Sequence, residues 1–166
     1  MNLEDIQQLL TRKFGEAIIL STDTEGTPPV LQVSAPQIAE VCRFLHEHEQ
    51  TYFDYLSCLT ALDNGVEENT IEVIYHLYSI PYNFQLGLKV ILEREQGGRA
   101  LPQVPTVSHI WRSADWHERE AFDLLGVIFI GHPDLRRILL PADWKGHPLR
   151  KDYQEQAYYH GVKVEY

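Results

Sequence analysis

The segment from residue 126 to residue 153 constrains the fold of this chain most, because it is rich in apolar residues yet repeatedly interrupted by proline. Pro133, Pro141 and Pro148 lack a backbone N–H and restrict φ, so neither a long helix nor a central strand can pass through them. Apolar side chains without a regular element of their own must be buried against something else. We expect that surface to belong to another protein.

The composition fits one folded domain and argues against several classes of partner. Hydrophobic residues make up 44% of the 166 residues, which is enough for a packed core. The net charge of −10 argues against general binding of nucleic acid and against charge-driven docking on anionic lipid. No apolar run approaches the roughly 18–20 residues of a membrane span, so we expect no direct membrane insertion. We also find no secretory signal at the N-terminus.

The first half of the chain predicts two helices and two strands. A helix over residues 2–14 has Asn2 as its cap, and strands are expected over residues 16–22 and 29–34. Ser34 and Gln37 have the spacing of a capping box, and the apolar residues that follow up to residue 45 recur with helical period. These elements alternate between helix and strand without any repeat or flexible linker.

A dense β region follows. Residues 51–62 are rich in aromatic and leucine residues, and residues 71–79 and 84–92 alternate between apolar and polar. Asp63-Asn64-Gly65 predicts a turn, and Gly97-Gly98 predicts a loop. The element order predicts an α+β fold, a two-layer sandwich of a mainly antiparallel sheet with helices on one face. We expect a globular domain over residues 1–125 and an extended C-terminal docking arm over residues 126–166.

A charged helix precedes the arm and carries a carboxylate on its apolar face. Ser113 or Asp115 is the expected cap, and Gly126 the expected end. Glu118 lies in the middle of the apolar stripe, where a carboxylate is costly unless it is paired or protonated. We favour a salt bridge to an arginine of the arm, over an ion pair across a subunit boundary or a general acid. Arg119 could pair with the residue four positions later, Asp123.

The His117-Glu118 dipeptide does not extend to a zinc-binding H-E-x-x-H motif, because residue 121 is alanine. Cys42 and Cys58 are the only cysteines, and two thiolates cannot hold a structural zinc or a cluster unaided. We expect no metal site in this chain.

The arm contains an internal echo in which a Gly-His-Pro bend is followed by a leucine and two cations. The bends contain His132 and His147, and each histidine is expected to bond a backbone group within its own turn. The basic pairs could bind phosphate, but arginine forks fit carboxylates equally well and are typical of protein interfaces. The basic residues are Arg136, Arg137, Arg150 and Lys151, and the acidic residues among them are Asp134, Asp143 and Asp152.

The run from residue 118, EREAFDLLG, continuing through GHPDLRRILLP, DW and GHPLRKDY, closely resembles the 30-kilodalton subunit family of respiratory complex I, the NADH–quinone oxidoreductase. The resemblance is dense over residues 117–153, whereas residues 1–116 share only length and layout with the family. Its family residues, which it implies to be an interface between subunits, are Glu118, Arg119, Glu120, Asp123, His132, Asp134, Arg136, Arg137, Trp144, His147, Arg150, Asp152 and Tyr153.

The resemblance implies a non-catalytic subunit of the peripheral arm of the complex. FMN, iron–sulfur clusters and quinone would reside in partner subunits, and none in this chain. The docking arm would bind the adjacent quinone-site subunit, which helps form the quinone cavity, at the cytoplasmic face of the bacterial inner membrane. An equivalent subunit of a related ferredoxin-linked or hydrogenase-linked complex is an alternative.

Two other classes of function are kept beside this one. The first is a small free-standing enzyme that uses Glu118 with His132 or His147 as acid and base, which requires these side chains to meet in a pocket. The second is a generic metal-binding or nucleic-acid-binding module.

Overall fold

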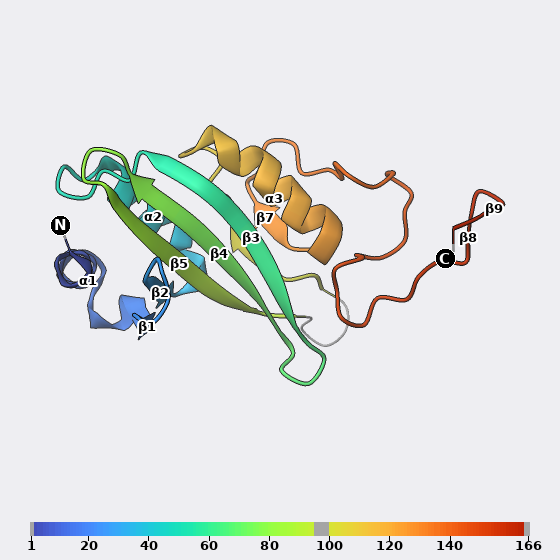
Figure 1. Ribbon diagram of the computed structural model, residues 1–166, viewed down its shortest axis with the longest axis horizontal. Coiled ribbons are helices and arrows are strands. Elements are labelled where there is room, and N and C mark those ends of the chain that lie inside the picture. The colour runs from blue at the N-terminus through green and yellow to red at the C-terminus, as the bar shows by residue number, and fades with distance from the viewer. Residues whose placement is uncertain (1, 95–99, 165–166) are drawn as a thin grey trace.

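A computed structural model describes residues 2–94 and 100–164, and its centre is a five-stranded mixed sheet (Figure 1). The strand order is β1-β2-β5-β4-β3, with antiparallel pairing except between β2 and β5, which run parallel. The strands are β1 (Ile19–Asp23), β2 (Val30–Val33), β3 (Tyr55–Gly65), β4 (Thr70–Ser79) and β5 (Phe84–Glu93). The α+β fold with a mainly antiparallel sheet is therefore confirmed.

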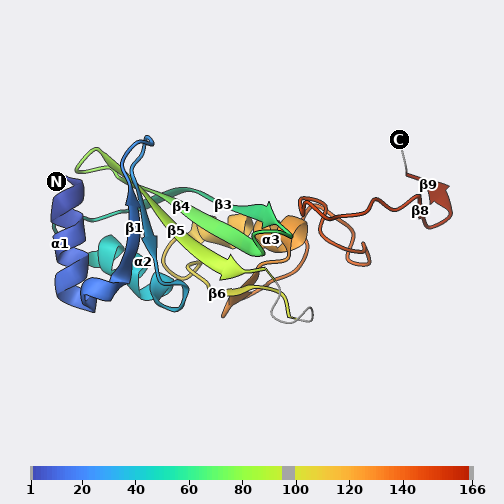
Figure 2. The ribbon, with the colours of Figure 1, turned by 90° about the horizontal axis from the view of Figure 1, so that it is seen from below.

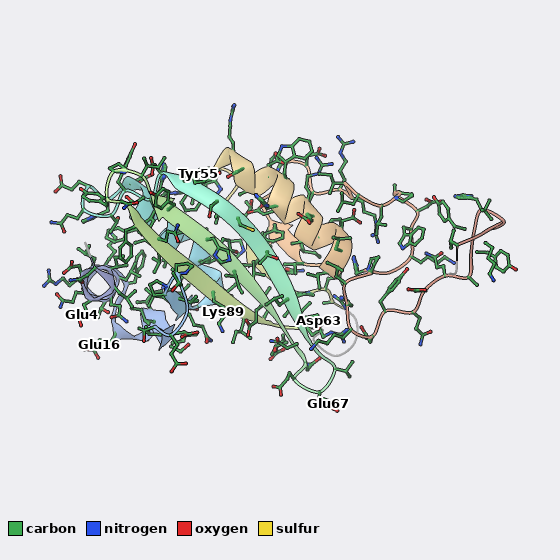
Figure 3. The ribbon with its side chains drawn as sticks, in the orientation of Figure 1. Glu4, Glu16, Tyr55, Asp63, Glu67 and Lys89 are labelled. Atoms are coloured by element: carbon green, nitrogen blue, oxygen red, sulfur yellow. The ribbon has the colours of Figure 1, made fainter. Side chains whose placement is uncertain are left out.

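The helices leave one face of the sheet open. Helix α2 (Ile38–Glu47) packs behind the sheet, α1 (Leu3–Phe14) lies at its β1 end, and α3 (Arg112–Leu125) runs along β3 (Figure 1). Short 3₁₀ turns over Glu16–Ile18 and Ala35–Gln37 precede β1 and α2. Strand β4 alternates between fully buried and half-exposed residues, which is the pattern of a sheet with one covered face. The open face carries Tyr55 and Lys89, whose side chains are labelled in Figure 3.

The signals expected at element ends are confirmed only in part. Asn2 caps α1 as predicted, and Asp5 completes a reciprocal capping box. The predicted box of Ser34 and Gln37 is wrong, because the Ser34 side chain makes no capping bond. Likewise, α3 begins after Trp111 and not after Ser113 or Asp115.

The predicted turn at residues 63–65 is also wrong, since β3 continues through Gly65 and the turn occupies residues 66–69. Asp63 is therefore a strand residue whose carboxylate is used for a long-range contact. The predicted loop at Gly97-Gly98 falls on residues 95–99, which lie outside the described residues.

The chain beyond α3 divides into a packed part and a projecting part. Strand β7 (Ile128–Ile130) pairs in parallel with β6 (Gln103–Pro105), and Val127 and Phe129 are buried in the core. Irregular chain follows, and the small hairpin of β8 (Tyr158–Tyr159) and β9 (Val162–Lys163) lies far from the sheet (Figure 2). The division into a body over 1–125 and an arm over 126–166 stays a prediction. We call residues 126–164 the arm and residues 154–164 the tail.

Candidate functional site: the fastening of the arm

A single carboxylate, that of Asp123 in α3, fixes the first bend of the arm. Its side chain is fully buried, and its Oδ2 accepts the consecutive backbone N–H groups of Ile138 at 3.0 Å, Leu139 at 2.7 Å and Leu140 at 2.9 Å. Its Oδ1 accepts Nη1 of Arg137 at 2.7 Å. Burial alone would raise the pKa of Asp123, but these four donors outweigh it, so that the pKa is lowered.

Arm residues also satisfy the last carbonyl groups of α3, which have no partner within the helix. The Asp123 carbonyl accepts from Arg137 at 3.1 Å and from Nδ1 of His147 at 2.9 Å. The Leu124 carbonyl accepts the N–H of Leu149 at 3.0 Å, and the Leu125 carbonyl accepts Nε of Arg150 at 2.8 Å. Cationic side chains are favourable at a helix C-terminus, so this end of α3 is a docking point for the arm.

These contacts correct two predictions. His147 bonds a helix carbonyl and not a group within its own turn. Arg119 does not direct its guanidinium at Asp123, because its Nε and Nη2 donate to the carbonyls of Arg136 and Arg137 at 3.2 and 3.4 Å. The Arg119 guanidinium also lies 5.2 Å from the centre of the Trp116 ring. The helix therefore holds the arm through its arginine as well as through its aspartate.

Gly126 makes the close approach of the arm possible. Its φ of 75° is left-handed, as expected for the residue after a helix, and a Cβ there would lie 2.7 Å from the His147 ring. Both the conformation and the space therefore require glycine at this position.

A second buried carboxylate, that of Asp63 at the end of β3, fastens the second bend (Figure 3). It accepts Nε of Arg94 at 2.9 Å, the N–H of Lys151 at 2.8 Å and the N–H of Gly65 at 3.0 Å. Arg94 also donates to Asp152 of the arm. Burial would raise the pKa of Asp63, but the backbone and Arg94 contacts lower it. Sequence reasoning missed Asp63 and Arg94, which lie 88 and 57 residues before Lys151.

Glu118 lies between the body and the first bend, but its partners differ from the arm arginine expected from the sequence. Its fully buried carboxylate accepts Oγ1 of Thr106 and the N–H of Val107, the latter at 2.7 Å. Nε2 of His132 lies 3.9 Å away and donates to the Asp115 carbonyl at 3.1 Å. The prediction for His132 is confirmed, because its Nδ1 accepts the N–H of Asp134 within the turn. The arm arginine with a buried carboxylate partner is Arg137, at Asp123.

The protonation of Glu118 makes stability depend on pH. Burial raises its pKa from 4.5 to about 7, against the lowering effect of the Thr106 and Val107 hydrogen bonds. The folded state thus holds a proton that the unfolded state loses above its own pKa, so this contribution is present below pH 4.5 and is lost as the pH rises to about 7. Its full size is about 3 kcal/mol.

We therefore expect the difference in unfolding free energy between Glu118→Gln and the wild type to shift in favour of the variant between pH 4.5 and about 7, and to level off above. Urea denaturation at closely spaced pH values measures it, and Glu120→Gln, an exposed residue of the same helix, is the control. A difference that does not change with pH would show that Glu118 is ionised throughout.

The acid–base pair of the free-standing enzyme hypothesis meets only in part. Glu118 and His132 converge, but both side chains have zero exposure, so a substrate could not reach them. His147 is engaged at the Asp123 carbonyl. The arrangement serves cohesion between the body and the arm and offers no site for a reaction.

The other predicted site residues lie on the outside of the arm or of α3. Arg136 is 73% exposed and bonds Asp134 at 2.9 Å, and Glu120 is exposed on α3. Nε1 of Trp144 donates to the Tyr153 hydroxyl at 3.0 Å. Leu139 and Leu149, at the two fastened bends, are 61% and 58% exposed. The two buried carboxylates, which we call the clamps, thus bury polar groups of the arm and leave leucine side chains facing outward.

In the part of the chain that the structure describes, no cluster of three or more His, Cys, Asp or Glu residues is placed to hold a metal ion. Over the same residues, no helix is both long and apolar enough to cross a membrane.

The fold and the two clamps define the class of the protein as an α+β domain that fastens and presents a C-terminal arm. The family model of the respiratory-chain NADH dehydrogenase 30 Kd subunit matches residues 31–159. The chain belongs to this family, and the resemblance noted in the sequence is confirmed.

Relatives support this membership over nearly the whole chain. The C component of NADH-quinone oxidoreductase from Chlorobium phaeobacteroides is 38% identical, over 95% of this chain and 92% of the relative. The C component from Chloroherpeton thalassium is 41% identical over 96% of this chain, which spans only 64% of that relative. A combined C/D component from Acinetobacter baylyi is 39% identical over 92% of this chain and 26% of its own length.

A solved structure shares the fold. It is a chain in the membrane-bound sulfane sulfur reductase, described as an archaeal respiratory membrane complex. It matches with a TM-score of 0.73 and 25% identity, over 93% of this chain and 87% of that one.

Proposed function

We propose that this chain is a non-catalytic subunit of a proton-translocating NADH:quinone oxidoreductase and that it supports the adjacent quinone-site subunit, which is the D component of the complex. The observation that carries the proposal is the fastened arm, whose buried polar clamps leave leucine side chains exposed. Exposed apolar side chains on an ordered support are typical of protein interfaces. The C/D relative supports this neighbour, because its two parts share one chain.

In this proposal the chain carries no redox cofactor, and FMN, iron–sulfur clusters and quinone reside in its partners. The chain would reach the cytoplasmic face of the bacterial inner membrane through the complex. Its contribution to electron transfer from NADH to quinone is to hold the quinone-site subunit in place. The family residues on the arm would form the interface, with the exposed Arg136 as a direct contact.

An equivalent role in a related complex is the second candidate. The similarity to a chain of an archaeal respiratory membrane complex favours it, since one fold would then serve different electron donors. Co-purification of the chain with its native complex distinguishes the two, because an NADH-oxidising complex retains a flavin-containing partner.

Two arm arginines, Arg136 and Arg150, should have separable effects on binding and on stability. Arg136→Ala is expected to weaken binding to the quinone-site subunit about tenfold with the melting temperature unchanged, because this side chain is 73% exposed. Arg150→Ala should lower the melting temperature as well, because Arg150 is only 9% exposed and bonds the end of α3.

Titration calorimetry with the purified quinone-site subunit and differential scanning calorimetry of each variant measure the two effects. Binding by Arg136→Ala that equals wild-type binding would remove Arg136 from the interface. Failure of the wild-type chain itself to bind this partner would refute the proposed function.

A further inference from the structure

The tail folds back over the second bend of the arm and encloses a cavity of about 280 Å³. Its lining is mainly apolar and comes from both segments: Leu140, Trp144, Pro148, Tyr153, Gln156 and Val164, with Glu155 beside them. We call this cavity the arm cup. It is smaller than the roughly 300–1,000 Å³ of small-molecule sites, so its size suits one or two side chains better than a cofactor.

The arm cup is held together by specific contacts. Trp144 bonds the Tyr153 hydroxyl at 3.0 Å and packs against the Tyr159 ring, with centroids 5.2 Å apart. The N–H of Val164 donates to the Ala157 carbonyl at 3.0 Å, which closes the tail hairpin. The N–H of Leu140 is one of the three held by Asp123, so the clamp also positions the wall of the cup.

One polar group in the lining has a capacity that the fold does not use. Nε2 of Gln156 is buried and has no hydrogen-bond partner within the described residues. A buried donor without an acceptor is costly, and such groups are rare in native proteins. A peptide carbonyl entering the cup would satisfy it. The Glu155 carboxylate beside it is exposed and would favour a cation near the same entrance.

We propose that the arm cup receives a large apolar side chain of the neighbouring quinone-site subunit, from a segment whose peptide carbonyl accepts Gln156 and whose adjacent lysine or arginine faces Glu155. This inference rests on the proposed function and identifies the chemistry of the contact. The exposed Leu139, Leu149 and Tyr158 on the same arm would extend the contact beyond the cup.

The test is the affinity of the full chain for the purified quinone-site subunit, by titration calorimetry, with the cup filled from within. Val164→Phe occupies the cup and should weaken binding at least tenfold. Val66→Phe makes the same change at a 62% exposed residue of the β3–β4 turn and should bind within twofold of the wild type. The NMR shift of the Trp144 indole N–H, which bonds Tyr153, reports whether the tail stays folded.

Gln156→Leu gives a reading that a structural role would not. Removing a donor without a partner should leave the tail as stable as before, or more so, while binding falls about fivefold to tenfold. Glu155→Lys should weaken binding further and make it less sensitive to salt.

A photo-crosslinking residue at position 156 should label a segment of the quinone-site subunit that contains a large apolar residue next to lysine or arginine. Wild-type binding by both Val164→Phe and Gln156→Leu, or crosslinks confined to this chain, would overturn the inference and leave the proposed function intact. Absence of wild-type binding would instead refute the proposed function.

Discussion

Replacing Asp123 with alanine is expected to lower the free energy of unfolding by about 3–5 kcal/mol, because it strands four hydrogen-bond donors in the protein interior. Three of these are the consecutive N–H groups of residues 138–140, and the fourth is the largely buried guanidinium of Arg137. For a chain of this length we expect the melting temperature to fall by roughly 10 °C. Binding to the quinone-site subunit should fall with it, since Leu139 and Leu140 lose their fixed positions.

Asp134→Ala is the matched control, because it also removes an aspartate that pairs with an arm arginine. The Asp134–Arg136 pair is exposed, with 50% and 73% of the side-chain surfaces accessible. Exposed ion pairs contribute about 0–1 kcal/mol, so this variant should melt near the wild-type temperature. Urea denaturation and scanning calorimetry measure both. Equal melting temperatures for the two variants would mean that the three N–H groups find water or other acceptors, and that Asp123 is not a clamp.

Asp63→Ala is expected to have the second largest effect, a loss of about 3 kcal/mol, because it leaves the buried Arg94 with one carboxylate partner in place of two. It also removes the acceptor of the Lys151 N–H, which ties the second bend to the body. Amide hydrogen exchange should show faster exchange at Lys151 together with the lower stability.

Asp152→Ala tests the same network from its exposed end. The Asp152 side chain is 49% exposed, whereas that of Asp63 is 1% exposed, so the loss should stay within about 1 kcal/mol. A variant of Asp152 as unstable as that of Asp63 would show that Arg94 depends on the arm carboxylate, and that the anchor lies in the arm and not in β3.

Regular elements could be predicted from the sequence because their periodicity is local. The alternation over residues 71–79 and 84–92 matches β4 and β5 within one residue at either end. Helix α1 is recognisable from its cap and its apolar stripe, since both signals lie within a few residues of the helix. Element ends controlled by tertiary contacts are less predictable, and the turn expected at Asp63 is the clearest case.

The fastening of the arm could be predicted only in part. The sequence indicates that Glu118 must be compensated, but not that Thr106 and Val107 do it, because these partners come from outside the helix. For Asp123 the sequence suggests only a weak pair with Arg119, since a helical spacing of four is visible in sequence whereas a turn of three N–H groups is not. The prolines of the arm are informative, because an apolar segment without regular structure needs a support, and α3 and β3 provide it.

Hydrogen exchange on the arm, with and without the quinone-site subunit, tests most directly whether this chain fastens its arm in order to present it to a partner. We predict that the bends near Asp123 and Asp63 are already protected in the isolated chain, and that residues 154–164 gain protection only when the partner is present. Unchanged exchange of the tail at saturating partner would contradict this role of the arm.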